Sequence, residues 1–425
     1  MNQSNWTVGE YLWHQVKSLG ITKVPGIPGD VILPLMDQGY ESGIEFIGCE
    51  NEQNAGYIGD GMARQHGVAA FITTTAVGSL SAFNATASSA AEKVGVIHIS
   101  GGLPSHLYAK RELVHHSIGG ELYKNREAFK VITNGRAEVL LDPETAPDII
   151  DSLLTYSATY SEPCFIEVPV DIGAKPCRAP EPLLSVVETS DPRSVQQAKS
   201  ALTQFISDKP NRLLIPGFLL KRLKLEKEAQ QLLDETGLPF TTLLTDKGLF
   251  SERHPQFCGT YLGVASAIEF QDFFNESDLY INLGCWLTDI QSICGSVEMP
   301  AAKTVIVHEN ALEIGGERFE KIPMIESINL LQQVLGVNND RTHPQAEQMQ
   351  AYAGQFNRPM QESLSVDGFF EMLSTAIQSE DHIVVEAGTA LFSGCGLLLP
   401  EGLAMITQPS GLQLVRVQAQ LWAPH

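Results

Sequence analysis

The sequence has few basic residues and no long apolar run. Its 425 residues include 28 Lys and Arg against 50 Asp and Glu, a net charge of −22. Because a phosphate backbone and an anionic membrane surface both attract basic proteins, we expect neither nucleic acid nor a membrane as a partner. No uninterrupted apolar stretch reaches the ~18 residues that a membrane-spanning helix needs.

Several motifs that would define a function class or compartment are also missing. The seven cysteines are scattered and form no Cys-x-x-Cys pair, which favours reduced thiols. The first residues have neither the basic nor the apolar region of a signal peptide, so we expect a cytoplasmic protein. The chain contains no P-loop, no Gly-x-Ser-x-Gly elbow and no Gly-x-Gly-x-x-Gly after a strand, which disfavours kinase, serine-hydrolase and NAD-dependent functions.

What is present is an alternation of strands and helices. Apolar strand patterns at 45–49, 68–75, 96–100 and 164–168 alternate with helical patterns, and a second such series runs from 212 to 307. This order predicts the α/β class, with successive doubly wound parallel sheets covered on both faces. A proline-rich stretch at 176–193 and a polar stretch at 337–359 predict linkers before a second and a third unit.

The first candidate site is Gly26-Ile27-Pro28-Gly29-Asp30, directly after a short strand-like segment. Loops that leave the carboxyl end of a parallel strand are where α/β proteins build sites. The alternative is a simple turn in which Asp30 caps the next helix.

Glu52 and the pair His115-His116 are the next candidates. Glu52 follows a buried strand at a helix start, where an acidic residue also simply favours the helix N-terminus. Adjacent histidines point in different directions and seldom chelate one metal together, but they can relay protons near neutral pH. A polar surface loop is the alternative for the pair.

One further motif resembles a metal-binding motif but does not indicate a metal site. Gly59-Asp60-Gly61 looks like the start of a diphosphate–metal motif, but such a motif needs an Asn pair downstream, and the nearby stretch offers only Asn84 inside a predicted helix. We therefore assign no metal ligand in this sequence.

Taken together, GIPGD, ENEQNAGYIGDGMAR, SLSAFNA, VIHISG and LVHHSIG, in this order and spacing, resemble the thiamine diphosphate-dependent 2-oxo acid decarboxylases. This group includes the pyruvate and indolepyruvate/phenylpyruvate decarboxylases. The similarity covers about 1–409. It implies a pyrimidine-binding domain at 1–180, a central α/β domain at 195–340, and the start of a diphosphate-binding domain at 360–425.

The resemblance also implies roles for individual residues. Glu52 would hydrogen-bond the cofactor's pyrimidine ring, and Asp30, His115 and His116 would handle protons during catalysis. Gly29, Val77, Gly78 and Asn84, together with Glu52, would bind the cofactor. The substrate would be a small 2-oxo acid, converted to an aldehyde and CO2 with thiamine diphosphate and Mg2+, in a homodimer or homotetramer with active sites between subunits.

The sequence departs from the family in places. Pro25 replaces the usual aromatic residue, Ala76-Val77-Gly78-Ser79 the usual Gly-Val-Gly-Glu, and Gly95 a usual proline. The family's Mg2+ motif, Gly-Asp-Gly with a downstream Asn pair, is absent from the third unit. We therefore expect a C-terminally truncated member, and the alternative function is an inactive remnant or pseudoenzyme subunit. An FAD-containing synthase of the same superfamily is a third alternative.

The residues after Gln408-Pro409 no longer follow the family. Reading plausible codons one base earlier restores several family residues, so we hypothesise a frameshift near 409–410 and early termination.

Overall fold

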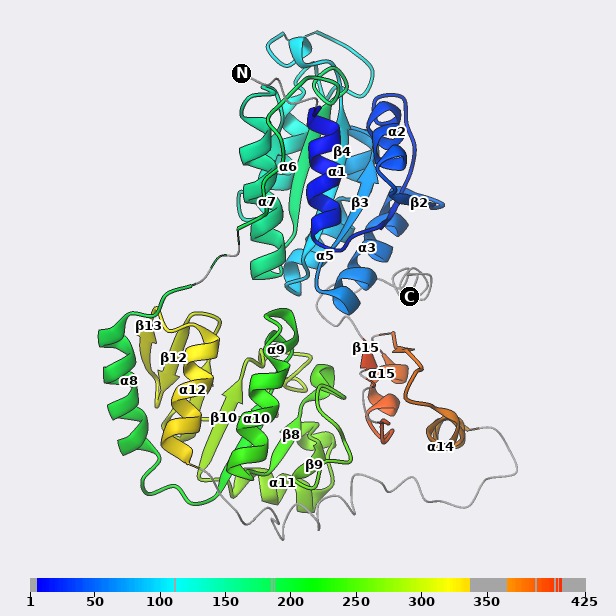
Figure 1. The fold of residues 1–425 in the computed structure, drawn as a ribbon. Helices are drawn as coiled ribbons and strands as arrows, with labels where there is room; N and C mark the ends of the chain where they lie inside the picture. Colours follow the sequence, from blue (N-terminus) through cyan, green and yellow to red (C-terminus); the bar gives the residue numbers. More distant parts are fainter. Residues whose placement is uncertain are drawn as a thin grey trace. The chain divides into compact units, whose positions relative to one another are not determined.

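The computed structural model describes residues 6–110, 112–184, 186, 188–336, 365–386, 388–400, 403, 405 and 406, apart from the side chains of 367 and 371. The predicted linker at 337–359 and the frameshift proposed near 409–410 lie outside these residues. The chain divides into two compact units, Met1–Val186 and Val187–Leu412 (Figure 1).

The sheet of the first unit is entirely parallel. Its strands lie in the order β2-β1-β3-β4-β6-β5. Their bounds are β1 Lys23–Gly26, β2 Glu45–Gly48, β3 Ala69–Thr73, β4 Val96–Gly102, β5 Ala137–Val139 and β6 Cys164–Pro169. The order reverses direction between the neighbours β1 and β3, as in a doubly wound sheet, so the predicted fold class is confirmed.

Helices cover both faces of this sheet. Alternate residues of β3 point to opposite sides: Ile72 joins a core with α1, α2 and α7, whereas Phe71 joins a core with α3 and α5. The helix bounds are α1 Val8–Ser18, α2 Leu33–Glu41, α3 Glu52–His66, α4 Val77–Ser81, α5 Phe83–Ala91, α6 Tyr123–Ile132 and α7 Ala146–Tyr160.

Local signals explain two helix boundaries. Thr7 and Glu10 form a reciprocal capping box at the start of α1. The predicted helix that contains Asn84 is instead two helices, because α4 ends and α5 begins around Ala82.

The second unit contains a mixed seven-stranded sheet of order β13-β12-β11-β10-β7-β8-β9. Strands β7 Arg212–Pro216, β8 Phe240–Thr242, β9 Phe257–Thr260, β10 Leu279–Leu283 and β11 Thr304–Val307 are parallel. An antiparallel edge that the sequence reading missed, β12 Ala311–Ile314 and β13 Glu317–Glu320, completes it. The helices are α8 Pro192–Phe205, α9 Leu219–Arg222, α10 Glu226–Thr236, α11 Ile268–Asn275 and α12 Met324–Leu335.

A small group of elements follows in the same unit. It comprises α14 Val366–Ala376, α15 Thr389–Gly394 and the two-stranded parallel sheet of β14 Ile383–Val384 and β15 Met405–Ile406. Leu244, which lies in the short 3-10 turn directly after β8, packs into the apolar core of this small group. The Leu399 N–H donates a hydrogen bond to Glu252 over 2.9 Å. Glu252 is itself fully buried in an ion pair with Lys247.

Candidate functional site

The loops after the parallel strands of the first unit carry most of the predicted site residues. Asp30 follows β1, Glu52 follows β2, the segment 74–78 follows β3, and the histidine pair lies on the long connection after β4. Carboxyl ends of parallel strands meet at one edge of a sheet, which is the usual position of a site in this fold class.

Glycines make the loop after β1 possible. A Cβ on Gly26 would lie 2.5 Å from the backbone carbonyl oxygen of Ile72, so only glycine fits against β3. A Cβ on Gly29 would lie 2.7 Å from the Cβ of Thr74. The loop therefore packs closely against the carboxyl end of β3, and this contact positions Asp30 at the edge of the sheet.

Asp30 does not cap α2, so the alternative interpretation of this residue is wrong. The N-cap position is Ile32, which makes no side-chain capping bond. The Asp30 carboxylate accepts from the Val31 N–H over 2.9 Å and from Nε2 of His115 over 2.9 Å. The bond from His115 lowers the pKa of Asp30 below its ordinary value, so the carboxylate is charged at neutral pH.

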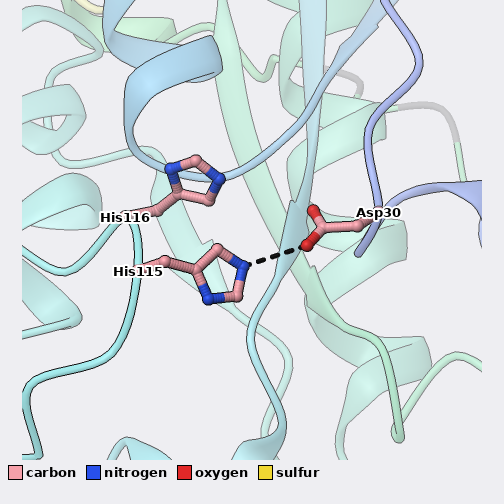
Figure 2. A group of neighbouring side chains, drawn as sticks. All are labelled: Asp30, His115 and His116. Atoms are coloured by element: carbon pink, nitrogen blue, oxygen red, sulfur yellow. Dashed lines mark hydrogen bonds and ion pairs between the residues drawn. The ribbon is translucent and has the colours of Figure 1, made fainter.

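Both histidines come to the same place. His116 has a positive φ of 64°, unusual for a residue with a side chain. The two imidazole rings have centroids 4.7 Å apart. Figure 2 shows both rings on the side of the loop that faces Asp30. The prediction that adjacent histidines diverge does not hold at this backbone geometry.

Glu52 is the first residue of α3 and lies beside the loop after β3. Asn51 caps the helix by accepting from the Asn54 N–H over 2.8 Å, and the described residues give the Glu52 carboxylate no hydrogen bond. A Cβ on Gly78 would lie 3.3 Å from Oε1 of Glu52. The absence of a side chain at Gly78 therefore lets the backbone of this loop lie close to Thr74 and to the half-buried Glu52 carboxylate.

Thr74 connects these loops. It is buried between Gly29 and Gly78, and its Oγ1 has no hydrogen-bond partner among the described residues. The next turn is strained: Ala76 has φ 44° and ψ −89°, and Val77 behind it is 57% exposed. Strained, exposed turns of this kind occur at ligand-binding sites. Asn84 lies on α5 with an exposed side chain, and no described contact joins it to the other site residues.

Sequence reasoning missed a buried polar network beneath this turn. The Glu167 carboxylate on β6 accepts from the Tyr108 hydroxyl, from the Asn125 side-chain amide and from the Thr75 hydroxyl over 3.3 Å. Asn125 in turn accepts from the Ser79 hydroxyl over 2.8 Å. The network thus holds both ends of the turn at Ala76. The signal was a single acid in the otherwise apolar strand Cys164–Pro169.

The Glu167 network predicts a pH-dependent stability. Burial raises the pKa of Glu167 to about 7, although the three hydrogen bonds to its carboxylate each lower the pKa. Between the ordinary pKa and pH 7 the folded state keeps a proton that the unfolded state has lost. Stability should fall as pH rises through this window, by at most about 1.4 kcal/mol per pH unit.

Denaturant unfolding from pH 5 to pH 8 of the wild type and Glu167→Gln measures this effect. Subtracting the two curves isolates Glu167 from Asp246, whose pKa burial also raises to about 7. The wild type should lose stability relative to the variant as pH rises. Parallel curves would show that Glu167 does not titrate in this window.

The Gly59-Asp60-Gly61 motif is buried in the core of the first unit. Asp60 is fully buried in the middle of α3. Its carboxylate accepts from Nε of Arg64 over 2.6 Å and from the Ser89 hydroxyl over 2.8 Å, and Arg64 also pairs with Glu92 over 2.6 Å. The motif therefore forms a buried ion-pair network that joins α3 to the end of α5.

Comparisons with known proteins define the class. Residues 6–127 match the thiamine pyrophosphate enzyme N-terminal TPP binding domain, and residues 200–335 match the thiamine pyrophosphate enzyme central domain. Thiamine pyrophosphate and thiamine diphosphate are the same cofactor. The two matched domains fall in the two structural units, so fold and comparison agree on a thiamine diphosphate enzyme.

The relatives narrow the class further. The chain is 30% identical to an alpha-keto-acid decarboxylase of Mycolicibacterium paratuberculosis over 412 residues, which is 95% of this chain and 72% of the relative. It is 28% identical to pyruvate decarboxylase isozyme 3 of Saccharomyces cerevisiae, with the same coverage, and 30% identical to pyruvate decarboxylase 2 of Arabidopsis thaliana, covering 93% of this chain and 66% of the relative. The chain belongs to the thiamine diphosphate-dependent 2-oxo acid decarboxylase family, whose members are carboxy-lyases. No helix in the described part of the chain is long and apolar enough to cross a membrane.

Proposed function

We propose that this protein decarboxylates a 2-oxo acid of the pyruvate, indolepyruvate or phenylpyruvate type to an aldehyde and CO2, in the cytoplasm, with thiamine diphosphate and Mg2+. The observation that carries the proposal is the convergence of Asp30, His115 and His116 at the loop edge of a domain that matches the TPP-binding model. The relatives' printed names supply the reaction class.

The residues beside Glu52 fit the cofactor. Gly78 brings the loop backbone close to the Glu52 carboxylate, and the buried Thr74 hydroxyl has no partner among the described residues. Glu52, Gly29, Val77, Gly78 and Asn84 are the proposed binding residues. Bound there, the cofactor supplies the electron sink that accepts the electrons released when CO2 leaves.

The chain's own groups then have distinct tasks. Glu52 would hydrogen-bond the ring nitrogen of the cofactor's pyrimidine and exchange a proton with it, which makes Glu52 an acid–base group. The charged Asp30 carboxylate orients His115 through the 2.9 Å bond. His115 and His116 supply and remove the protons that aldehyde formation and release require. We propose a homodimer or homotetramer with the active site between subunits, as in the family resemblance.

A second candidate is a catalytically inactive subunit. The observation that favours it is the burial of Asp60: the Gly-Asp-Gly of this chain is committed to a core ion pair and is not available to a diphosphate-bound Mg2+. Such a subunit would retain the pyrimidine half of the site without turnover.

An assay of the purified full chain separates the two candidates. Pyruvate, indolepyruvate and phenylpyruvate are each incubated with thiamine diphosphate and Mg2+, and CO2 and aldehyde are quantified with and without EDTA. Equal amounts of both products, lost with EDTA, are expected for the decarboxylase. Cofactor binding without product from any of the three acids would establish the inactive subunit.

Gly78→Ala tests the cofactor site. The new methyl group would lie 2.7 Å from Cγ2 of Thr74 and 3.3 Å from the Glu52 carboxylate. Overpacking of this kind costs about 1–3 kcal/mol, so we expect thiamine diphosphate affinity to fall about tenfold or more in a calorimetric titration. Gly48→Ala is the matched control, because no atom lies within 4 Å of its added Cβ. Equal affinities of the two variants would place the cofactor elsewhere.

A further inference from the structure

The cluster formed by Asp30, His115 and His116 has the composition of a transition-metal site. One potential ligand atom from each residue lies within 4.8 Å of the other two, and no other such group of three occurs in the described part of the chain. Two imidazoles and a carboxylate are the donor set that Zn2+ uses in three-ligand sites with an open fourth position. We propose that this cluster binds one Zn2+ ion and that the bound ion inhibits the enzyme.

The backbone at His116 makes the site possible. In a regular extended segment, neighbouring side chains point to opposite sides. The positive φ of 64° at His116 breaks that alternation, and both rings lie near Asp30 (Figure 2). The left-handed backbone at His116 therefore brings two imidazoles close to one carboxylate.

The distances suit zinc after a small movement. Ligands at the Zn–N and Zn–O distance of about 2.0–2.1 Å in a tetrahedral site are roughly 3.4 Å apart. Nε2 of His115 and Oδ2 of Asp30, at 2.9 Å, must separate slightly. The ligand atom of His116 lies within 4.8 Å of the other two, so it must approach by at most about 1.4 Å to reach the same spacing. Both Asp30 and His115 have 59% exposed side chains, so little packing opposes these rotations.

The same donor set disfavours Mg2+. This hard ion takes oxygen ligands in near-ideal octahedral geometry, and two imidazole nitrogens do not meet that demand. The site is therefore distinct in its chemistry from the Mg2+ that the proposed function needs, and saturating Mg2+ should leave it open for Zn2+.

Inhibition follows from the roles of the three residues, and this part rests on the proposed function. A bound Zn2+ occupies the imidazole nitrogens and the carboxylate oxygen that would otherwise carry and orient protons. Zn2+ should therefore lower the decarboxylation rate without lowering thiamine diphosphate affinity, because Glu52 and Gly78 are not ligands.

The binding test needs neither cofactor nor substrate. ZnCl2 is titrated calorimetrically into the full chain in a non-chelating buffer at pH 7.5 with excess Mg2+. We expect one saturable Zn2+ per chain, with affinity at least tenfold weaker in both His115→Gln and Asp30→Asn. His66→Gln is the matched control, since His66 is an exposed histidine in the last turn of α3, and it should bind as the wild type does. Absence of saturable binding, or equal binding by all three variants, would overturn the site.

A second arm tests the inhibition. Decarboxylation is measured with increasing Zn2+ at saturating thiamine diphosphate and Mg2+, and the half-inhibitory concentration should match the calorimetric affinity. Zn2+ binding with an unchanged rate would overturn the inhibitory role. If Zn2+ binds but the chain forms no product even without Zn2+, the metal site stands and the proposed function fails, so the two failures are distinguishable.

Discussion

Glu52→Gln is expected to reduce the decarboxylation rate by about 10²–10⁴-fold, the range for loss of a positioned acid–base group. Glutamine keeps the length and shape of the side chain but loses the negative charge. The substituted amide can still contact the cofactor, so the turnover number should fall far more than the affinity for the 2-oxo acid. Steady-state kinetics at saturating thiamine diphosphate and Mg2+ measures both.

The structure supplies a strict control for this prediction. Glu50 is an exposed acid two residues earlier in the same loop, so Glu50→Gln removes the same charge without changing the close approach of Glu52 to Gly78. It should keep nearly the full rate. The thermal midpoint of Glu52→Gln should fall only slightly, because the described residues give its carboxylate no hydrogen bond and Asn51 provides the helix cap, so that only the favourable charge at the helix N-terminus is lost. Equal rates for Glu50→Gln and Glu52→Gln would exclude the proposed role of Glu52.

Arg64→Met should lower the free energy of unfolding of the first unit by about 3–5 kcal/mol. Arg64 is buried between Asp60 and Glu92, and its removal leaves two carboxylates without their shared counter-ion in the core. The buried charges, rather than the lost side-chain volume, account for the size of this effect. Urea unfolding followed by tryptophan fluorescence measures it, since Trp13 lies in the core of the same unit.

Two further variants separate charge from packing. Lys124→Met removes a surface lysine whose ion pair with Glu121 is largely exposed, and it should cost less than about 1 kcal/mol. The triple variant Asp60→Asn, Arg64→Met, Glu92→Gln removes all three charges and should be more stable than Arg64→Met alone. A triple variant less stable than the single one would show that lost packing dominates.

Much of the fold and part of the site follow from local patterns. Strands β3, β4 and β6 of the first sheet are buried, largely apolar runs, so their positions are readable from the sequence. The capping box at Thr7 fixes the start of α1. The antiparallel edge β12–β13 was not predictable in this way, because short strands of mixed polarity have no distinct period.

The residues of the candidate site likewise fall into those that local motifs predict and those that only long-range contacts reveal. Residues in distinctive motifs, such as Asp30, Glu52 and the histidine pair, could be predicted from residue type and order. The contact of Gly78 with Glu52 and the Glu167 network could not, since they join residues 26 to 92 positions apart in the sequence. The convergence of the two histidines depends on one backbone angle at His116 that no sequence pattern encodes.

The central claim is that the loop edge of the first unit holds thiamine diphosphate through Glu52 for decarboxylation. The most direct measurement is CO2 release from pyruvate and phenylpyruvate by the wild type and Glu52→Gln, with cofactor binding followed in the same samples. We predict saturable cofactor binding and CO2 release by the wild type, with turnover lost in the variant. A wild type that binds no thiamine diphosphate, or a variant that turns over equally fast, would contradict the claim.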